Sequence, residues 1–273
     1  MSHDLQYQTL PSVGPGVDHA YGPRVHIHSY AYPMALLTRL CHPETNQPQT
    51  NQLVSRLFDY LLARVASADL EMRAMDLPTR MSDLHPEEGR YRGAVLDTSQ
   101  KVIVVDIARA GMLPAQRFFD GFCHLLRPEA VREDHIFMNR RTNAEGQVIG
   151  VDLSGSKIGG PVNNRVVIMP DPMGATGGSL VRAIDLYRER EEGAPKHFVA
   201  VHLIITPEYI KRVTEAVPNV TIHAIRLDRG LSAPDVLATR PGERWDEERG
   251  LNANQYIVPG AGGVGELINN AEF

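Results

Sequence analysis

Five short apolar runs, separated by stretches with a helical pattern, constrain the fold of this chain more than any other feature. The runs are rich in valine and isoleucine and show little polar alternation, which is typical of strands covered on both faces. They occupy residues 102–107, 135–139, 165–170, 197–205 and 221–227. Helical patterns lie between several of them, at residues 112–126, 177–190 and 207–217. Strands and helices that alternate in this way predict an α/β fold around a parallel sheet.

Outside this core, no linker divides the chain, so residues 1–273 are predicted to form a single domain. Thr50–Ala68 has the apolar periodicity of an amphipathic helix. Residues 1–24 are punctuated by proline and glycine and indicate an extended arm. Residues 140–164 are rich in Gly, Asn and Ser, and a long loop inside a compact domain is usually functional, so we expect a mobile loop. Residues 231–250, which contain the only tryptophan, are charged and proline-broken and are expected to form an irregular insertion.

The composition argues against several classes of partner. The formal net charge is −5, without the basic excess of a nucleic-acid binder, so no nucleic-acid partner is expected. No apolar run approaches the ~18 residues that a membrane span needs, so no membrane partner is expected. The two cysteines, Cys41 and Cys123, lie outside any paired motif. We expect reduced, buried thiols in a cytoplasmic protein.

Candidate functional residues gather where predicted strands end. Ligands of an open parallel sheet bind beyond the carboxyl ends of its strands. Three segments occupy that edge here: Ala108–Gly111, the loop that Arg140 opens, and the stretch "DPMGATGGS" at residues 171–179. The third places Asp171 directly after a strand, between two prolines that hold it stiffly and delay the following helix.

The glycines and hydroxyls of that third segment suit an anion. Gly174, Gly177 and Gly178 let backbone N–H groups approach a phosphate closely, and Thr176 and Ser179 add hydroxyl donors. The helix predicted to start there directs its positive end to the same place. No lysine follows, so the segment is not a nucleoside-triphosphate loop. Taken alone, the pattern fits a phosphate cradle or a plain glycine-rich turn with a capping residue.

The whole string resembles the ribose-phosphate signature of the type I phosphoribosyltransferases. Its Asp-Pro-Met opening is most similar to uracil phosphoribosyltransferase, and only Gly174 departs, where that family usually has leucine. "ARAGM" resembles the family's pyrophosphate loop, with Ala108 in place of leucine. "MNRRT" resembles the start of its catalytic loop and places Arg140 on the family's arginine. "YIVPGAGGVGE" resembles its uracil loop, and the resemblance extends over residues 25–268.

This resemblance implies a parallel-sheet core with a smaller hood built from the N- and C-terminal segments. It implies transfer of a phosphoribosyl group from phosphoribosyl pyrophosphate (PRPP) to uracil, which forms UMP and pyrophosphate in pyrimidine salvage. Mg²⁺ would arrive with PRPP, no metal ligand from the protein is assigned, and a homodimer or higher homo-oligomer is expected. The residues implied in catalysis are Asp171, Arg109 and Arg140.

In the same resemblance, Asp171 holds the ribose hydroxyls and the two arginines neutralise the pyrophosphate. The expected PRPP-binding residues are Arg109, Arg140, Asp171, Pro172, Met173, Gly174, Ala175, Thr176, Gly177, Gly178 and Ser179. The expected uracil-binding residues, which act through the backbone, are Ile257, Gly262, Gly263 and Val264. The peptide bond between Ala108 and Arg109 is expected to be cis, as it often is in this loop of the family.

One departure leaves the activity open. Gly263 stands where the family's uracil loop has an aspartate that helps to bind PRPP, and Glu266 stands at that loop's second acid. Either Glu266 or an acid of the 231–250 segment (Asp246, Glu247 or Glu248) supplies the missing charge, or uracil turnover is weak while PRPP binding is retained. The alternatives to an active uracil enzyme are therefore a PRPP- or nucleotide-sensing regulator and a phosphoribosyltransferase for another base.

Two further patterns are set aside. "GAGGVG", residues 260–265, satisfies the dinucleotide-binding spacing but lies too near the end of the sequence for the helix and second strand of that motif. His26 and His28 alternate like ligands on one face of a strand, yet no nearby Cys, Asp or Glu completes a metal site.

Overall fold

The computed structural model describes residues 16–142, 148–190 and 193–271. Its described residues form one large sheet of eight strands with the order β1-β10-β9-β7-β4-β5-β6, and β8 pairs with β9. The strands are β1 (Val25–Ile27), β4 (Lys101–Ala108), β5 (Val131–Thr142), β6 (Val148–Lys157), β7 (Arg165–Pro170), β8 (Met173–Gly174), β9 (His197–Ile205) and β10 (Val220–Leu227). All pairings in this sheet are parallel except β5 with β6.

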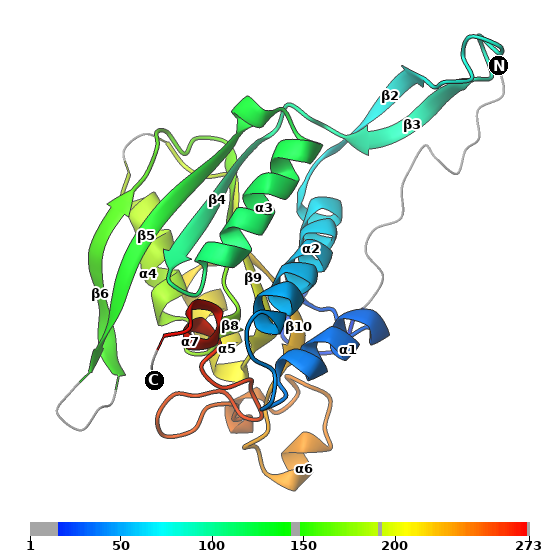
Figure 1. The fold of residues 1–273 in the computed structure, drawn as a ribbon. Helices are drawn as coiled ribbons and strands as arrows, with labels where there is room; N and C mark the ends of the chain where they lie inside the picture. Colours follow the sequence, from blue (N-terminus) through cyan, green and yellow to red (C-terminus); the bar gives the residue numbers. More distant parts are fainter. Residues whose placement is uncertain (1–15, 143–147, 191–192, 272–273) are drawn as a thin grey trace.

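Helices cover both faces of the sheet, which explains why its strands are apolar along their whole length (Figure 1). The helices are α1 (Ala31–Leu40), α2 (Gln49–Asp69), α3 (Met112–Leu125), α4 (Gly178–Arg188), α5 (Pro207–Ala216), α6 (Pro234–Leu237) and α7 (Val264–Asn269). Side chains of α1, α2, α3 and α7 pack with Val102 and Val104 on one face. Those of α4 and α5 pack with Ile103 and Val105 on the other. Successive residues of β4 therefore enter opposite cores.

The five predicted strands, the three helices predicted between them and the helix predicted at Thr50–Ala68 are confirmed, with ends that differ by a few residues at most except at β5. The predicted loop at residues 140–164 is corrected. β5 continues to Thr142 and pairs antiparallel with β6, so much of this segment is a β-hairpin at the sheet edge. Its residues 143–147, and with them the predicted mobility of the tip, lie outside the described residues.

A second correction concerns the cysteines, which are unpaired as predicted but only partly buried. The predicted irregular segment at residues 231–250 contains only α6 and a 3-10 turn, Trp245–Glu247. Of the predicted N-terminal arm, residues 1–15 lie outside the description, and Tyr21 is buried against the rest of the chain.

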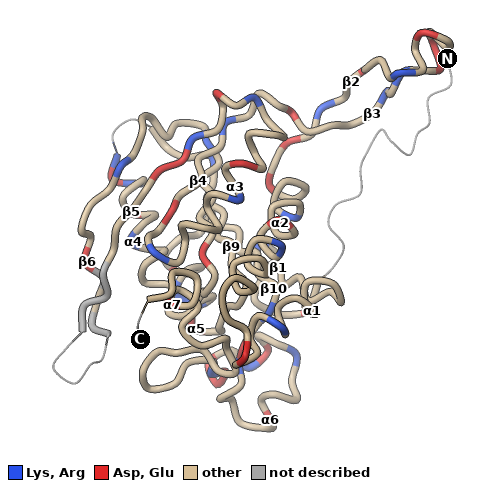
Figure 2. The backbone as a smooth tube through the Cα atoms, in the orientation of Figure 1, with Lys and Arg blue, Asp and Glu red and all other residues tan. Residues whose placement is uncertain are grey.

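One feature was not predicted at all. Strands β2 (Met72–Pro78) and β3 (Arg90–Leu96) form an antiparallel hairpin outside the main sheet. It projects away from the body of the molecule between α2 and β4 (Figure 1). Charges of both signs lie along it (Figure 2), and Met81 and Leu84 are 49% and 74% exposed near its tip.

Candidate functional site

The carboxyl ends of the parallel strands bring the predicted segments together. Gly111 follows β4, and a Cβ added there would lie 2.8 Å from the Ile107 carbonyl oxygen and 3.3 Å from that of Pro170. The loop after β4 therefore packs against the last residue of β7, next to Asp171. A Cβ added to Gly265, in the first turn of α7, would lie 3.2 Å from the Cβ of Ala110. The loop after β4, the start of the 171–179 stretch and the first turn of α7 thus meet at one edge of the sheet.

Asp171 is held from both sides at the end of β7. Its amide donates to the Val201 carbonyl at 2.9 Å, and its carboxylate accepts from the Met173 amide at 3.0 Å. Its carbonyl oxygen lies 2.7 Å from Nδ1 of His202. A carbonyl can only accept, so Nδ1 carries the proton and donates. Burial lowers the pKa of His202 to about 4, which keeps the ring neutral at pH 7.

The neutral ring of His202 needs a donor at its second nitrogen, and Tyr209 supplies it. The Tyr209 hydroxyl lies 2.5 Å from Nε2, and burial raises the pKa of that hydroxyl well above its usual value, so it stays protonated. Tyr209 and His202 are 1% and 2% exposed. Together they fix the backbone carbonyl of Asp171 at the end of β7.

The glycine-rich turn after Asp171 contains a residue with a left-handed backbone. Gly177 has a φ of +76° and directly precedes α4, so a side chain would be strained there. Thr206 anchors the turn, because its hydroxyl donates to the Ala175 carbonyl at 2.7 Å and its amide to the Gly174 carbonyl at 3.2 Å. A Cβ added to Gly178 would lie 3.3 Å from Nη1 of Arg212, so a guanidinium flanks the positive end of α4.

Space explains the departure at Gly174. A Cβ added there would lie 2.8 Å from Cγ2 of Ile205 and 3.2 Å from the ring of His202. Both neighbours are fully or almost fully buried. The volume that a leucine would need is therefore already filled by side chains of β9.

The predicted arginines are placed by their backbones. The Ala108–Arg109 peptide bond is cis, as predicted. Arg140 belongs to β5, three residues past Phe137, which pairs with Ala108 of β4. The backbone of Arg140 therefore lies further along the strand direction than the sheet edge at which Arg109 lies. The structure does not describe the side chain of Arg140.

The predicted base loop, residues 257–264, is held by two residues that the sequence analysis did not select. The Asp228 carboxylate accepts from the Gly260 amide at 2.7 Å. Arg226 donates to both carboxylate oxygens of Asp228, at 2.6 and 2.7 Å, and to the Gly260 carbonyl at 2.9 Å. Asp228 directly follows the strand predicted at 221–227, as Asp171 directly follows the strand predicted at 165–170. This place after a strand was the sequence signal that could have identified Asp228.

The acids considered as substitutes for the missing aspartate are mostly engaged elsewhere. Asp246 pairs with Lys211, and Glu247 pairs with Arg244. Glu248 is buried and accepts from Arg229. Glu266 lies in the first turn of α7, directly after the Gly265 that contacts Ala110. Gly263 itself has a φ of −80°, which other residues adopt readily.

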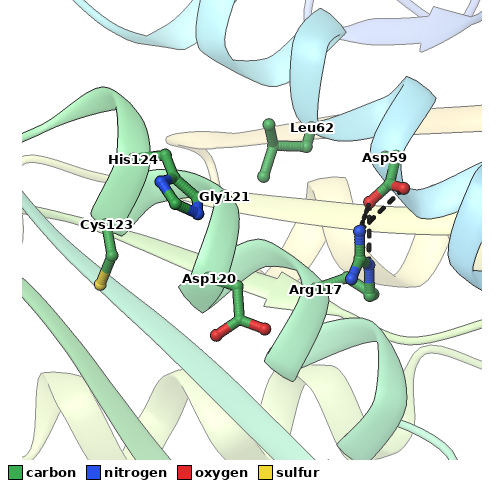
Figure 3. Close-up of a pocket in the computed structure, with 7 residues that line it drawn as sticks. All are labelled: Asp59, Leu62, Arg117, Asp120, Gly121, Cys123 and His124. Atoms are coloured by element: carbon green, nitrogen blue, oxygen red, sulfur yellow. Dashed lines mark hydrogen bonds and ion pairs between the residues drawn. The ribbon is translucent and has the colours of Figure 1, made fainter.

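A groove between α2 and α3 is separate from this edge (Figure 3). None of the predicted site residues line it, and an ion pair between Arg117 and Asp59 bridges the two helices beside it. Across the described ranges, no cluster of three or more His, Cys, Asp or Glu residues is arranged to hold a metal ion. His28 instead lies 3.0 Å from His223, ring nitrogen to ring nitrogen. In the same part of the chain, no helix combines the length and apolar character required to cross a membrane.

Comparison with known proteins gives consistent results. A family model described as uracil phosphoribosyltransferase matches residues 31–243, so its match ends within the 231–250 segment, before the base loop. A uracil phosphoribosyltransferase of Nocardioides sp. is 30% identical over 248 residues, 90% of this chain and 97% of that protein. One of Pyrobaculum islandicum is 29% identical over 89% of this chain and 97% of that protein. The structure of the AQ2163 protein from Aquifex aeolicus has a TM-score of 0.65 at 21% identity, covering 89% of this chain and 97% of that one.

Proposed function

Because the chain belongs to the uracil phosphoribosyltransferase family, we propose that it transfers the phosphoribosyl group of PRPP to N1 of uracil, forming UMP and pyrophosphate. The observation that carries this proposal is the meeting of three loops at one sheet edge. The loop of Arg109 lies against the end of β7, and the first turn of α7 lies against Ala110. A ribose with a phosphate at one end and pyrophosphate at the other would contact all three loops.

Each loop has a distinct task in this reaction. The amides of residues 176–179 and the positive end of α4 bind the 5′-phosphate, and the Arg212 guanidinium beside Gly178 adds positive charge there. The Asp171 carboxylate accepts from the ribose hydroxyls. Arg109 and Arg140 neutralise the pyrophosphate as it leaves. The backbone at Ile257 and at 262–264 recognises the base.

Displacement at the ribose C1 passes through an oxocarbenium-like state, so positioning and charge stabilisation supply most of the catalysis. The fixed backbone of Asp171 contributes to the positioning, because His202 and Tyr209 prevent its carbonyl from moving. The hairpin opened by Arg140 would exclude water that could otherwise hydrolyse PRPP.

The donor set fits Mg²⁺ that arrives with PRPP. Asp171 offers hard carboxylate oxygens at the sheet edge, and Mg²⁺ commonly binds one or two carboxylates together with substrate phosphates and water. Bound there, Mg²⁺ would neutralise charge on the pyrophosphate.

The direct test is to incubate the protein with Mg²⁺, PRPP and uracil and to measure UMP, with cytosine, thymine and hypoxanthine as alternative bases. The expected result is that uracil gives UMP and that none of the other three bases gives a nucleotide. A second candidate, a PRPP-sensing protein with little turnover, is favoured by Gly263, which has no carboxylate to offer. Tight PRPP binding without product from any base would support that candidate and contradict the first.

We also propose that the protein acts in the cytoplasm as a homodimer or larger homo-oligomer, in which the β2–β3 hairpin contacts a second copy. An isolated two-stranded hairpin is marginally stable in water, and this one exposes Met81 and Leu84. Light scattering of the wild type and of Leu84→Glu tests this, with a lower mass for the variant as the expected result. Equal masses would contradict a role for the hairpin.

A further inference from the structure

The two ends of the 231–250 segment are bonded to a single residue of the base loop. Val258 accepts from the Gly230 amide at 3.1 Å and donates to the Gly250 carbonyl at 2.8 Å. Gly230 precedes the segment and Gly250 ends it. We call the two chain strands at the base of the segment, residues 229–231 and 248–250, its neck. Both backbone groups of Val258, which follows Ile257, are therefore held by this neck.

A buried ion pair closes that neck. Arg229 donates to Glu248 at 2.8 Å, and the two side chains are 12% and 0% exposed. The neck is also bonded through its backbone, because the Leu231 amide donates to the Arg249 carbonyl at 3.0 Å. The two terminal nitrogens of Arg229 also donate to carbonyls inside the segment, at Val236, Leu237 and Thr239. One guanidinium thus connects the body of the segment to its neck.

The segment is also anchored to two other parts of the protein. The Tyr21 hydroxyl donates to Glu248, and the Tyr21 ring meets Trp245 edge-on with 4.9 Å between centroids. The Trp245 indole donates to the Pro207 carbonyl, at the start of α5, at 3.0 Å. The segment is therefore attached to the N-terminal strand region and to α5, as well as to the base loop.

We propose that the 231–250 segment is a brace for the base loop, and that Arg229 and Glu248 are positioning residues that set the affinity for the base. This inference rests on the proposed function. If the neck opens, both hydrogen bonds of Val258 are lost, and base binding must then order a loop that is ordered in advance in the wild type. No hydrogen bond of the neck reaches residues 171–179 among the described residues, so binding of PRPP should not change.

The test compares Glu248→Gln with Asp235→Asn. Asp235 belongs to the same segment, but its exposed carboxylate pairs with Arg244 and not with Arg229, so it is a matched control. Glu248→Gln should raise KM for uracil about tenfold and change KM for PRPP less than twofold. In hydrogen exchange, peptides covering residues 251–263 should exchange about tenfold faster, while those covering 171–180 should not. The control should match the wild type in every measurement.

A milder variant covers the case in which Glu248→Gln does not fold. Tyr21→Phe removes one donor to Glu248 and keeps the ring, and it should produce the same pattern with a smaller change. Unchanged exchange of residues 251–263 in a folded variant would overturn the brace, whether or not the protein makes UMP. Equal increases in both KM values would also overturn it. If the wild type makes no UMP, the proposed function fails, and hydrogen exchange still decides whether the segment braces the loop.

Discussion

Gly174→Ala tests whether the departure at this position is enforced by packing. The added methyl group would lie 2.8 Å from Cγ2 of Ile205 and 3.2 Å from the His202 ring. Neither neighbour can move freely. Ile205 is fully buried and its β-branched side chain is stiff at χ1. The His202 ring is bonded at both nitrogens, to Asp171 and to Tyr209.

We therefore expect the substitution to destabilise the protein by about 1–3 kcal/mol, the usual cost of overpacking a close-packed core. For a chain of this size, each kcal/mol lowers Tm by about 2–4 °C. A shift of His202 would also displace the Asp171 carbonyl, so PRPP affinity should fall. Gly155→Ala is the matched control, because a Cβ added to Gly155, on β6, meets nothing within 4 Å.

The second variant identifies the clash. Ile205→Leu removes Cγ2 at nearly constant volume and should cost less than about 1.5 kcal/mol alone. Combined with Gly174→Ala, it should restore about 1 kcal/mol or more relative to the sum of the two single changes. Urea unfolding of the four proteins, followed by circular dichroism, measures this coupling. If Gly174→Ala is as stable as the wild type, or the two changes are additive, the packing explanation is wrong.

Three further predictions concern catalysis and pH. Asp171→Asn should lower kcat/KM for UMP formation by several-fold to about a thousandfold, and wild-type turnover would refute its role. Gly263→Asp should raise activity towards uracil or raise the affinity for PRPP. The φ of −80° at Gly263 accepts a side chain, and an aspartate at this N-cap would form a capping box with Glu266. A wild type with fast turnover and a variant with unchanged activity would contradict this. Burial lowers the pKa of His28 to about 3 and of His202 to about 4. Below pH ~6.5 the unfolded chain therefore binds more protons than the folded protein. The free energy of unfolding in urea should accordingly fall by several kcal/mol between pH 6.5 and pH 4. An unfolding midpoint that is constant over that range would exclude the histidines as the cause.

The sheet and its covering helices were predictable because their signals are local. The run at 197–205 is apolar at almost every position, and β9 has the same bounds. Pro207 and Glu208 predict a helix start, and Thr206 caps that helix by accepting from the Tyr209 amide at 3.0 Å. By contrast, β2 is mostly exposed and β3 is only partly buried, and neither sequence, MRAMDLP or RYRGAVL, alternates polar and apolar residues in the way that identifies a half-buried strand.

The loops of the candidate site could be chosen from the sequence, but the residues that hold those loops could not. Asp171 could be chosen from its place after a strand and from the glycines that follow. His202 and Tyr209 could not be chosen in this way. A histidine within an apolar strand and an aromatic residue on a helix ordinarily indicate core packing. The pair that Arg229 forms with Glu248 joins residues 19 positions apart, and spacing along the chain gives no sign of such a contact.

The place of β1 in the sheet has a consequence for biosynthesis. Val25 pairs with Ile222, and His26 with His223, so the first strand of the sheet can dock only on the last. During synthesis from the N-terminus, β1 must wait until β10 has left the ribosome, with almost all of the α/β core already made. Formation of this edge is therefore a late, long-range step of the kind that slows folding. Until it is completed, the nascent chain exposes an unpaired strand edge at β10, where association with other nascent chains is most to be expected.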